Sequence, residues 1–480
     1  MNLRALLNDP ALPSIELAGL SEHSAAVTAD FAFVGVAANE ASLSAHCREA
    51  VARGATTLLI DAPALVDPNA YGVPVVQVQE LAQRRGALAA QFYGNPSAAM
   101  TCVGVTGTNG KTSVAHHLAS LSSQLGDAMG YSGTLGWGTL PRLQDAGMTT
   151  ATAVALQQQL AAMRDAGCRA VALEISSHAL DQQRAHAVQL DIGVFTNLSR
   201  DHLDYHSSFE AYAQAKARLF EDWPLRAAII NVDDPWGAQL AHKHADVAVT
   251  YGRHGQWAWS RAVGAPAAEV VWQTPQGEYR QVLHVAADYA LDNITAALAT
   301  LHCMGHEVAA LIQALPDLAA VPGRMEVFSA GDDAPTVVVD YAHTPDALEK
   351  VLRALRQHCQ GRLLCVIGCG GDRDRGKRPL MGECAAQHAD AAWFTADNPR
   401  GESVMAIIED MQQALSPTAA AQVQICVERV AAIRAAIGSA SAGDVILVAG
   451  KGHEPYQEIS GVRYASDDRL IVQQCLKEYD

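Results

Sequence analysis

The sequence has no long apolar segment. Its apolar runs are only as long as β-strands, whereas a helix needs about 20 consecutive apolar residues to span a bilayer. The first residues lead into Asn8-Asp9-Pro10 and not into the apolar core of a secretory signal. Basic residues are few, with 34 Lys and Arg against 51 Asp and Glu and a net charge of −17, which disfavours a nucleic-acid backbone as a partner. We therefore expect no membrane insertion and no nucleic-acid partner.

The ten cysteines lack the paired spacing of a disulfide framework or a zinc site. In a chain without a signal segment they are expected to be reduced and buried, which predicts a cytoplasmic location. Cys365 and Cys369 have C-x₃-C spacing, which can occur in metal sites. Because they lie at the end of an apolar, strand-like run, we interpret them as core residues. The sequence also contains no internal repeat and no low-complexity segment.

A length of 480 residues predicts about three domains, because a domain has roughly 150 residues. Boundaries are expected in the linker-like segments Tyr93–Ser97 and Val321–Arg324, which divide the chain into residues 1–92, 93–323 and 324–480. Apolar strand-like runs alternate with helical stretches throughout, which predicts an α/β fold. We expect a small N-terminal α/β domain, a central P-loop-type domain with a mostly parallel sheet, and a C-terminal Rossmann-like doubly wound domain. The predicted strands are 31–36, 57–60, 75–78, 100–105, 170–173, 192–195, 227–230, 336–339, 363–367, 391–394 and 445–448.

A glycine-rich run ends in Lys111-Thr112, between a predicted strand at 100–105 and a predicted helix at 113–121. This arrangement predicts a phosphate-binding loop, because glycines let backbone N–H groups face an anion and the helix N-terminus adds partial positive charge. Lys111 can reach the β- and γ-phosphates, and the Thr112 hydroxyl can ligate Mg²⁺. The match to G-x-x-x-x-G-K-[ST] is imperfect, because Val105 occupies the first glycine position.

Two further polar segments follow strands of the central domain. Glu174 ends the strand at 170–173, where an acidic side chain can bind Mg²⁺ beside the phosphates; a helix cap or salt bridge is the structural alternative. The segment from Thr196 to His206 is dense in ionisable side chains, and His202 lies where a strand passes into a loop. Lys216 lies in an amphipathic helix at 212–220, and this pattern alone predicts a surface lysine.

Four polar segments follow strands of the C-terminal domain. They begin at Asp340, Gly368, Asp397 and Gly450. The glycine-rich segment at 368–378 lacks G-x-G-x-x-G, which makes a dinucleotide site improbable. Each segment alone could be a structural turn, but their shared position at strand carboxyl ends predicts a single crevice.

Taken together these motifs resemble those of the Mur ligases of bacterial cell-wall synthesis, from about Met100 to Tyr456. The motifs that carry the resemblance are Gly107–Thr112, Glu174–His178, Thr196–His206, Tyr212–Phe220, Asp340–Pro345, Gly370–Arg378, Asp397–Arg400 and Gly450–Glu454. The resemblance implies an ATP-dependent ligase that forms an amide through an acyl phosphate, with Mg²⁺, in peptidoglycan precursor synthesis. The implied partners are UDP-N-acetylmuramoyl-L-alanyl-D-glutamate and meso-diaminopimelate, and the implied state is a monomer.

The resemblance also implies roles for individual residues. ATP-binding residues are Gly107, Thr108, Asn109, Gly110, Lys111, Thr112, Ser113, Asn293, Arg324 and Asp340. The catalytic and metal-binding residues are Lys111, Thr112, Glu174, His202 and Lys216, with Lys216 as a carbamate. UDP-substrate contacts are Ser24, Thr149, Thr150, Ser176, Gln182 and Arg184. Diaminopimelate contacts are Arg373, Asp397, Asn398, Pro399, Arg400, Gly450 and Glu454.

The Arg400 guanidinium is expected to bind the far carboxylate of diaminopimelate in a bidentate manner, through two N–H groups. L-lysine lacks that carboxylate and would leave a buried arginine unpaired. This reasoning predicts discrimination on the order of 10³-fold or more.

Two departures from the family pattern concern binding residues. An Asp-Ser-Arg signature appears as His23-Ser24-Ala25, and an Asn motif before Asn293 reads Ala287-Asp288-Tyr289-Ala290. Two alternatives stay open at this stage. One is a folylpolyglutamate synthase, which shares the phosphate loop and the lysine. The other is a nucleotide-binding module without catalysis, and the presence of Lys111, Glu174, His202 and Lys216 argues against it.

Overall fold

The computed structural model describes the chain except for residues 37–39, 62–67, 262–266, 285–286, 332 and 480. Its Cα positions form two compact units. One consists of Met1–Thr106, Gly126–Gly193 and Ala215–Ala227, and the other of Gly107–Leu125, Val194–Gln214 and Ala228–Asp480. Glu174 and Lys216 belong to the first unit, and the phosphate loop and His202 belong to the second.

The N-terminal strands form a four-stranded parallel sheet in the order β1-β2-β3-β4. Both of its faces are covered by buried apolar side chains, as is usual for parallel strands. The predicted small α/β fold is therefore confirmed. The elements are α1 (Leu3–Leu7), β1 (Gly19–Ser21), β2 (Phe31–Gly35), α2 (Glu40–Ala52), β3 (Ala55–Ile60), β4 (Val75–Gln77) and α3 (Leu81–Phe92).

The central sheet has eight strands in the order β12-β11-β10-β5-β9-β6-β7-β8. The pairs β5–β9, β6–β9 and β11–β12 are parallel, and β7 and β8 add an antiparallel edge, which confirms the mostly parallel sheet. Its strands are β5 (Thr101–Thr106), β6 (Met129–Gly133), β7 (Gly136–Thr139), β8 (Arg142–Gln144), β9 (Ala170–Glu174), β10 (Ile192–Phe195), β11 (Ala227–Asn231) and β12 (Ala248–Tyr251). The helices between them are α4 (Lys111–Gln124), α5 (Ala153–Asp165), α6 (Ser177–Asp181), α7 (Phe209–Glu221) and α8 (Pro235–Lys243).

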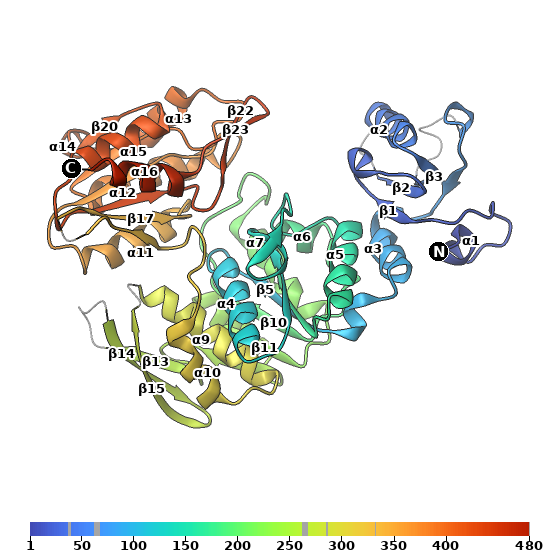
Figure 1. The fold of residues 1–480 in the computed structure, drawn as a ribbon, viewed down its shortest axis with the longest axis horizontal. Coiled ribbons are helices and arrows are strands. Elements are labelled where there is room, and N and C mark those ends of the chain that lie inside the picture. Colours follow the sequence, from blue (N-terminus) through green and yellow to red (C-terminus); the bar gives the residue numbers. More distant parts are fainter. Residues whose placement is uncertain (37–39, 62–67, 262–266, 285–286, 332, 480) are drawn as a thin grey trace. The chain divides into compact units, whose positions relative to one another are not determined.

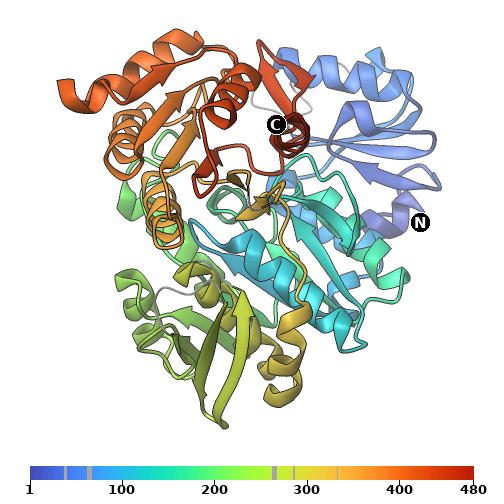
Figure 2. The ribbon, with the colours of Figure 1, turned by 60° about the vertical axis from the view of Figure 1, so that its left-hand side comes forward.

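A three-stranded antiparallel sheet follows, where the sequence predicted continued βαβ alternation. It consists of β13 (Ala258–Arg261), β14 (Ala267–Thr274) and β15 (Gly277–His284). A two-residue turn joins β14 to β15, which is too short for the crossover that parallel strands need. The sheet contacts α9 (Asp288–Cys303) and α10 (Val308–Ala314) (Figure 2). The buried Trp272 Nε1 donates to Thr295 Oγ1 at 3.0 Å.

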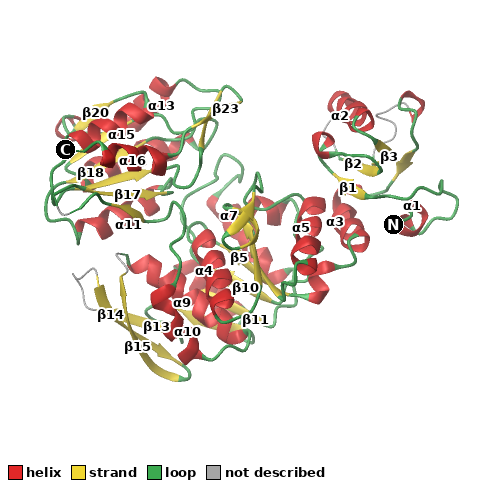
Figure 3. Cartoon of the chain, viewed as in Figure 1, coloured by secondary structure: helices red, strands yellow, loops and turns green. Residues whose placement is uncertain are grey.

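The C-terminal sheet has the order β16-β17-β21-β18-β19-β20 and helices on both faces (Figures 1 and 3). Leu363, Cys365 and Ile367 of β18 pack in one core with α11, α12 and α13, while Leu364 and Val366 pack in the other with α15 and α16. This alternation confirms the doubly wound prediction. The strands are β16 (Glu326–Phe328), β17 (Thr336–Asp340), β18 (Leu363–Ile367), β19 (Ala391–Phe394), β20 (Val423–Ile425), β21 (Val445–Ala449), β22 (Tyr456–Ile459) and β23 (Val462–Ala465). The helices are α11 (Pro345–Arg356), α12 (Arg378–His388), α13 (Val404–Gln412), α14 (Pro417–Ala420), α15 (Arg429–Gly438) and α16 (Asp468–Lys477).

All ten cysteines are free thiols, and seven of them are buried, including Cys365 and Cys369. Across the described ranges, no helix combines the length and the apolar character needed to cross a bilayer.

Candidate active site

The phosphate loop connects β5 to α4 with the backbone geometry that its glycines predict. Gly107 and Gly110 have φ values of +145° and +89°, which a residue with a side chain adopts only with strain. A Cβ at position 107 would lie 1.9 Å from Thr196 Oγ1, and a Cβ at position 110 would lie 2.5 Å from Asn293 Oδ1. Glycine is therefore needed at both positions for conformation and for space.

Helix α4 begins at Lys111, two residues before the predicted helix, so the lysine lies at the helix N-terminus. Lys111 Nζ donates to the carbonyl oxygens of Gly107 and Thr108 at 3.0 and 2.9 Å, which places the ammonium against the loop. Thr112 is buried, and Arg324 Nη2 donates to its hydroxyl at 3.3 Å. Ser113 is half-buried in the first turn of the helix.

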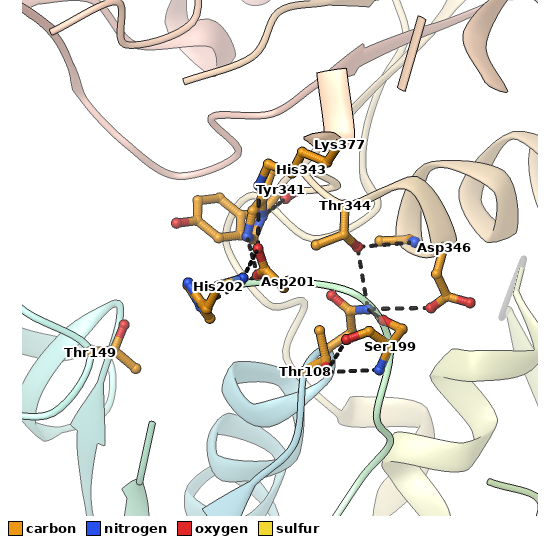
Figure 4. A network of polar contacts seen from close by, with 12 residues as sticks. Thr108, Thr149, Ser199, Asp201, His202, Tyr341, His343, Thr344, Asp346 and Lys377 are labelled. Carbon is orange, nitrogen blue, oxygen red and sulfur yellow. Dashed lines mark hydrogen bonds and ion pairs between the residues drawn. The ribbon is translucent and has the colours of Figure 1, made fainter. Parts of the chain in front are cut away.

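Thr108 and Asn109 attach the loop to the segment after β10. Ser199 N donates to Thr108 Oγ1 at 3.0 Å (Figure 4). The Tyr212 hydroxyl lies 3.0 Å from the same oxygen. Asn109 N donates to Asn197 Oδ1 at 3.0 Å. The polar side chains of the 196–206 segment therefore fix the shape of the loop, which is a structural use that the sequence did not reveal.

Asp201 is the centre of a second cluster in the same unit (Figure 4). Its carboxylate lies 3.4 Å from Lys377 Nζ, 3.6 Å from His343 Nε2 and 3.3 Å from His202 Nε2. Burial opposes ionisation of Asp201, but the hydrogen bond with His343 and the charge of Lys377 hold its pKa well below the usual value. His202 has a φ of +54°, which is uncommon for a residue with a side chain and is often found at functional sites.

Glu174 ends β9 and is 1% exposed, as expected for an acid enclosed in a site. The hydroxyl of Tyr131 donates to Oε1 at 2.5 Å, and Thr134 donates its N–H to Oε1 at 2.9 Å and its hydroxyl to Oε2 at 3.1 Å. These donors orient the carboxylate. The cap of the next helix is Ser176, so Glu174 itself is not a helix cap.

Five of the predicted UDP-substrate residues lie together near Glu174. Thr150 Oγ1 donates to the Glu174 carbonyl at 2.8 Å and lies 3.4 Å from Ser176 Oγ. Arg184 donates to the Thr150 carbonyl at 3.0 Å and, through Nη2, to Gln182 Oε1 at 2.6 Å. Thr149 accepts a hydrogen bond from the Thr134 hydroxyl at 3.1 Å. Ser24, the sixth, follows β1 and donates its hydroxyl to Glu49 Oε2 at 2.6 Å.

Lys216 is buried, which corrects the surface position that the helical pattern alone predicts. It lies in α7 with 1% of its surface exposed, beside Tyr212 and Leu219, which are both 0% exposed. A lysine is almost never fully buried unless it is paired or has a special function. The pattern failed because α7 is enclosed over more of its circumference than an amphipathic helix on a protein surface.

The four polar segments of the C-terminal sheet lie at one edge of that sheet, and the single crevice stays a prediction. Strands β17, β21, β18 and β19 are adjacent and parallel, so their carboxyl ends lie side by side. Asn398 Nδ2 donates to Glu454 Oε2 at 2.7 Å, and a Cβ at Gly450 would lie 2.4 Å from Asp397 Oδ2. Burial and the charge of Asp397 raise the pKa of Glu454.

Arg400 and Pro399 contact the glycine-rich segment after β18. Arg400 Nη1 donates to the Gly371 carbonyl at 2.9 Å, and its Nε lies 3.6 Å from Glu458 Oε2. A Cβ at Gly371 would lie 1.9 Å from the Pro399 carbonyl oxygen. The Arg400 side chain is 22% exposed and has a carboxylate neighbour, which corrects the expectation that L-lysine would leave a buried arginine unpaired. Arg373 is exposed at the same edge.

Three of the predicted ATP-binding residues lie outside the loop, and the family resemblance implies that they contact the base and ribose side of the nucleotide. Asn293, on α9, contacts Gly110. The Arg324 guanidinium stacks on the Tyr341 ring, 4.2 Å from its centre. Asp340 accepts the N–H groups of Met325 and Ala342, each at 2.8 Å, while burial raises its pKa.

No group of three or more His, Cys, Asp or Glu side chains in the described ranges is arranged to bind a metal ion. The predicted metal-binding set contains only two such residues, Glu174 and His202, and its other members are the Thr112 hydroxyl and a modified Lys216. Hydroxyl, carboxylate and carbamate oxygens are donors that suit Mg²⁺. The metal-binding roles stay predictions.

Some residues at the site were not identified from the sequence. Tyr131 and Thr134 bind the Glu174 carboxylate, and Lys377 and His343 contact Asp201. No local signal marks Tyr131 or Thr134, which lie in and just after an ordinary strand. Lys377 and His343 belong to segments that were identified as polar, but only the tertiary structure brings them to Asp201.

A phosphate loop, a buried Asp201 with basic neighbours in the same unit, and a second parallel sheet with polar segments at its carboxyl ends define a nucleotide-binding α/β protein. The sequence matches the Mur ligase middle domain over residues 105–301 and the Mur ligase glutamate ligase domain over residues 323–452. The chain belongs to the Mur ligase family.

Similar proteins cover nearly the whole chain. A protein of Ectopseudomonas mendocina named UDP-N-acetylmuramoyl-L-alanyl-D-glutamate–2,6-diaminopimelate ligase is 44% identical over 456 residues, which cover 93% of this chain and 92% of that protein. A solved structure of a ligase with the same name is 33% identical, covers 100% of this chain and 99% of its own, and has a TM-score of 0.66. A folylpolyglutamate synthase of Mycobacterium tuberculosis, solved with ADP and AMPPCP, has a TM-score of 0.61 at 19% identity; it shares the fold over 77% of this chain.

Proposed function

We propose that this chain is an ATP-dependent ligase that joins meso-diaminopimelate to the side-chain carboxylate of D-glutamate in UDP-N-acetylmuramoyl-L-alanyl-D-glutamate. The observation that carries the proposal is the match, over nearly the full length, to ligases named for these substrates. The phosphate loop and the polar edge of the C-terminal sheet support it. The reaction would be a step of peptidoglycan precursor synthesis in the cytoplasm, where free thiols stay reduced.

The chemistry follows from the weakness of a carboxylate as an electrophile. The D-glutamate carboxylate attacks the γ-phosphorus of ATP, and ADP leaves, which gives an acyl phosphate. The amine of diaminopimelate then attacks the acyl carbon, and the tetrahedral intermediate collapses to the amide with loss of a proton and of inorganic phosphate. Phosphorylation thus supplies the leaving group that the carboxylate lacks.

The loop residues would bind and orient the phosphates of ATP. Lys111, at the N-terminus of α4, would place its ammonium against the charge that develops on the transferred phosphoryl group. Asn293, Arg324 and Asp340 would contact the base and ribose side of the nucleotide. Mg²⁺, when bound by Thr112, Glu174, His202 and a carbamate on Lys216, would reduce the repulsion between the carboxylate and the γ-phosphate.

The two organic substrates would bind on different sheets. The UDP-linked substrate would contact Ser24, Thr149, Thr150, Ser176, Gln182 and Arg184. The amine would contact Arg373, Asp397, Asn398, Pro399, Arg400, Gly450 and Glu454. At the far end of diaminopimelate, Glu454 would accept hydrogen bonds from the ammonium group, and Arg400 would donate two hydrogen bonds to the carboxylate.

The test is a reaction that contains ATP, Mg²⁺, the UDP-dipeptide and meso-diaminopimelate. We expect release of phosphate and a product whose mass equals the sum of the two substrates less one water. Omission of either substrate should abolish the product. Phosphate release that depends on a folate and not on the UDP-dipeptide would instead support the folylpolyglutamate synthase alternative.

The choice of amine provides a separate prediction. L-lysine lacks one carboxylate of diaminopimelate, but Glu458 already neighbours Arg400, so lysine does not leave the guanidinium wholly unpaired. The loss is then that of a charged hydrogen bond, about 1.5–3 kcal/mol, which converts to on the order of 10- to 100-fold in kcat/KM. This value is smaller than the one that the sequence alone suggested.

Arg400→Ala should raise the KM for meso-diaminopimelate and leave the KM for ATP nearly unchanged, as measured by steady-state kinetics. Arg434→Ala is the matched control, because Arg434 lies on α15, pairs with Glu478 and is not among the proposed diaminopimelate contacts. Equal kcat/KM for L-lysine and meso-diaminopimelate in the unmodified enzyme would refute this account of the pocket.

A further inference from the structure

A buried ion pair lies behind the polar edge of the C-terminal sheet. Arg429 is the first residue of α15 and Asp468 is the first residue of α16, and their side chains are 1% and 0% exposed. Arg429 Nε donates to Asp468 Oδ1 at 2.9 Å, and Nη2 donates to Oδ2 at 2.7 Å. This two-bond geometry fixes the plane of the guanidinium.

The remaining donors of Arg429 bind the last residue of β21 and Ala396, which lies two residues after the end of β19. Nη1 donates to the Ala396 carbonyl at 3.2 Å, and Nη2 donates to the Ala449 carbonyl at 2.9 Å. The next residues in the chain are Asp397 and Gly450. Strand β18 lies between β19 and β21 in the sheet, so no backbone ladder joins these two strands directly. The guanidinium is therefore a direct connection between their carboxyl ends.

The side chains that follow these two carbonyls, those of Asp397, Asn398 and Glu454, are closely packed. Asp397 Oδ2 lies 2.4 Å from the place where a Cβ on residue 450 would be, so its carboxylate fits only against glycine. Asn398 donates its N–H to Asp397 Oδ1 at 2.7 Å and its amide to Glu454 Oε2 at 2.7 Å. A small shift of one strand end would move both carboxylates.

A second buried cation fixes the adjoining loop. Lys451 is 0% exposed, and its Nζ donates to the carbonyls of Glu454 at 3.3 Å and of Ser466 at 3.0 Å, and to that of Tyr456. These bonds close the segment after β21 and attach it to the residues that precede α16. The loop that carries Glu454 is therefore attached to the N-terminus of α16, where Asp468 binds Arg429.

We propose that Arg429 and Asp468 are positioning residues for the amine substrate. They fix the ends of β19 and β21 so that Asp397 and Glu454 keep the spacing that receives it. A buried ion pair is seldom worth more for stability than apolar residues of similar size, so its place behind the pocket points to geometry and not to folding energy. The inference rests on the proposed function for the identity of the amine.

The first test is Asp468→Asn, which keeps the shape of the side chain and removes its charge. The KM values for meso-diaminopimelate, ATP and the UDP-dipeptide are measured separately. We expect the KM for meso-diaminopimelate to rise about tenfold or more, as for other groups that orient a binding residue. The KM for the UDP-dipeptide should stay within about twofold, because its proposed contacts lie on other sheets. The KM for ATP should rise less than that for diaminopimelate, because most of its proposed contacts lie in the phosphate loop, although Asp340 of β17 pairs with Ala449 of β21.

Asp444→Asn is the matched control. Asp444 precedes β21 at the opposite end of the same strand, is 6% exposed on its side chain, and accepts from Arg362 Nη2 at 2.7 Å. It should lower the melting temperature as Asp468→Asn does but leave the KM for diaminopimelate unchanged. An equal rise of this KM in the two variants would overturn the proposal, because loss of stability alone would then explain it.

Arg429→Lys provides a second variant, which keeps the positive charge but offers one nitrogen for four contacts. We expect the KM of this variant for diaminopimelate to be higher than that of the unmodified enzyme. A KM equal to that of the unmodified enzyme would show that charge alone suffices and would overturn the proposal.

Amide hydrogen exchange separates this inference from the proposed function, because it needs no turnover. In Asp468→Asn, but not in Asp444→Asn, exchange should become faster in both 397–400 and 450–456. Unchanged exchange in these segments would overturn the positioning role. Failure of the unmodified enzyme to join diaminopimelate, with the exchange difference present, would refute the substrate assignment alone.

Discussion

Lys111→Ala should reduce ligation by on the order of 10²-fold or more and leave the fold intact. The lysine lies at the N-terminus of α4, and its ammonium contacts the loop carbonyls of Gly107 and Thr108. With ATP bound, the same charge would meet the phosphoryl group as negative charge develops there. Phosphate release and circular dichroism, measured on the same preparation, check the two parts of the prediction.

Lys243→Ala is the control for this experiment, because Lys243 is an exposed lysine at the end of α8 in the same sheet domain. It should leave turnover unchanged. Near-normal turnover in a folded Lys111→Ala protein would contradict the assignment of the phosphate loop.

Lys216→Ala should be nearly inactive, and a short carboxylate such as acetate should restore part of the activity. A carbamate converts the lysine from a cation into an anion, and acetate can supply a carboxylate in the space that the alanine leaves. The 1% exposure of Lys216 supports an enclosed site for such a group. Turnover with and without acetate, together with the intact mass measured in bicarbonate, checks the prediction.

Lys216→Arg is the matched variant, because it keeps a cation but cannot form the carbamate and leaves no space for acetate. It should be inactive with and without acetate. Electron density for a bare ammonium beside bound metal, or full activity of Lys216→Arg, would refute the modification.

The local sequence pattern was sufficient to predict most of the strands and the phosphate loop. The apolar runs at 363–367 and 445–448 became β18 and β21, because buried parallel strands need apolar residues on both faces. The antiparallel sheet β13–β15 was not predicted, since single strands there do not reveal whether a short turn or a helix joins them. Glu174 and His202 were identified as candidates from their position after strands.

The sequence by itself determined the fold class, the phosphate loop and the resemblance to the Mur ligases, because each depends on residues close together in the chain. Only the tertiary structure decided which of those residues meet. It buried Lys216, which a helical pattern places at the surface, and it placed Glu458 beside Arg400. It also brought Arg429 to the ends of β19 and β21. Burial and contact between distant segments depend on how helices and sheets pack, and no short stretch of sequence records that packing.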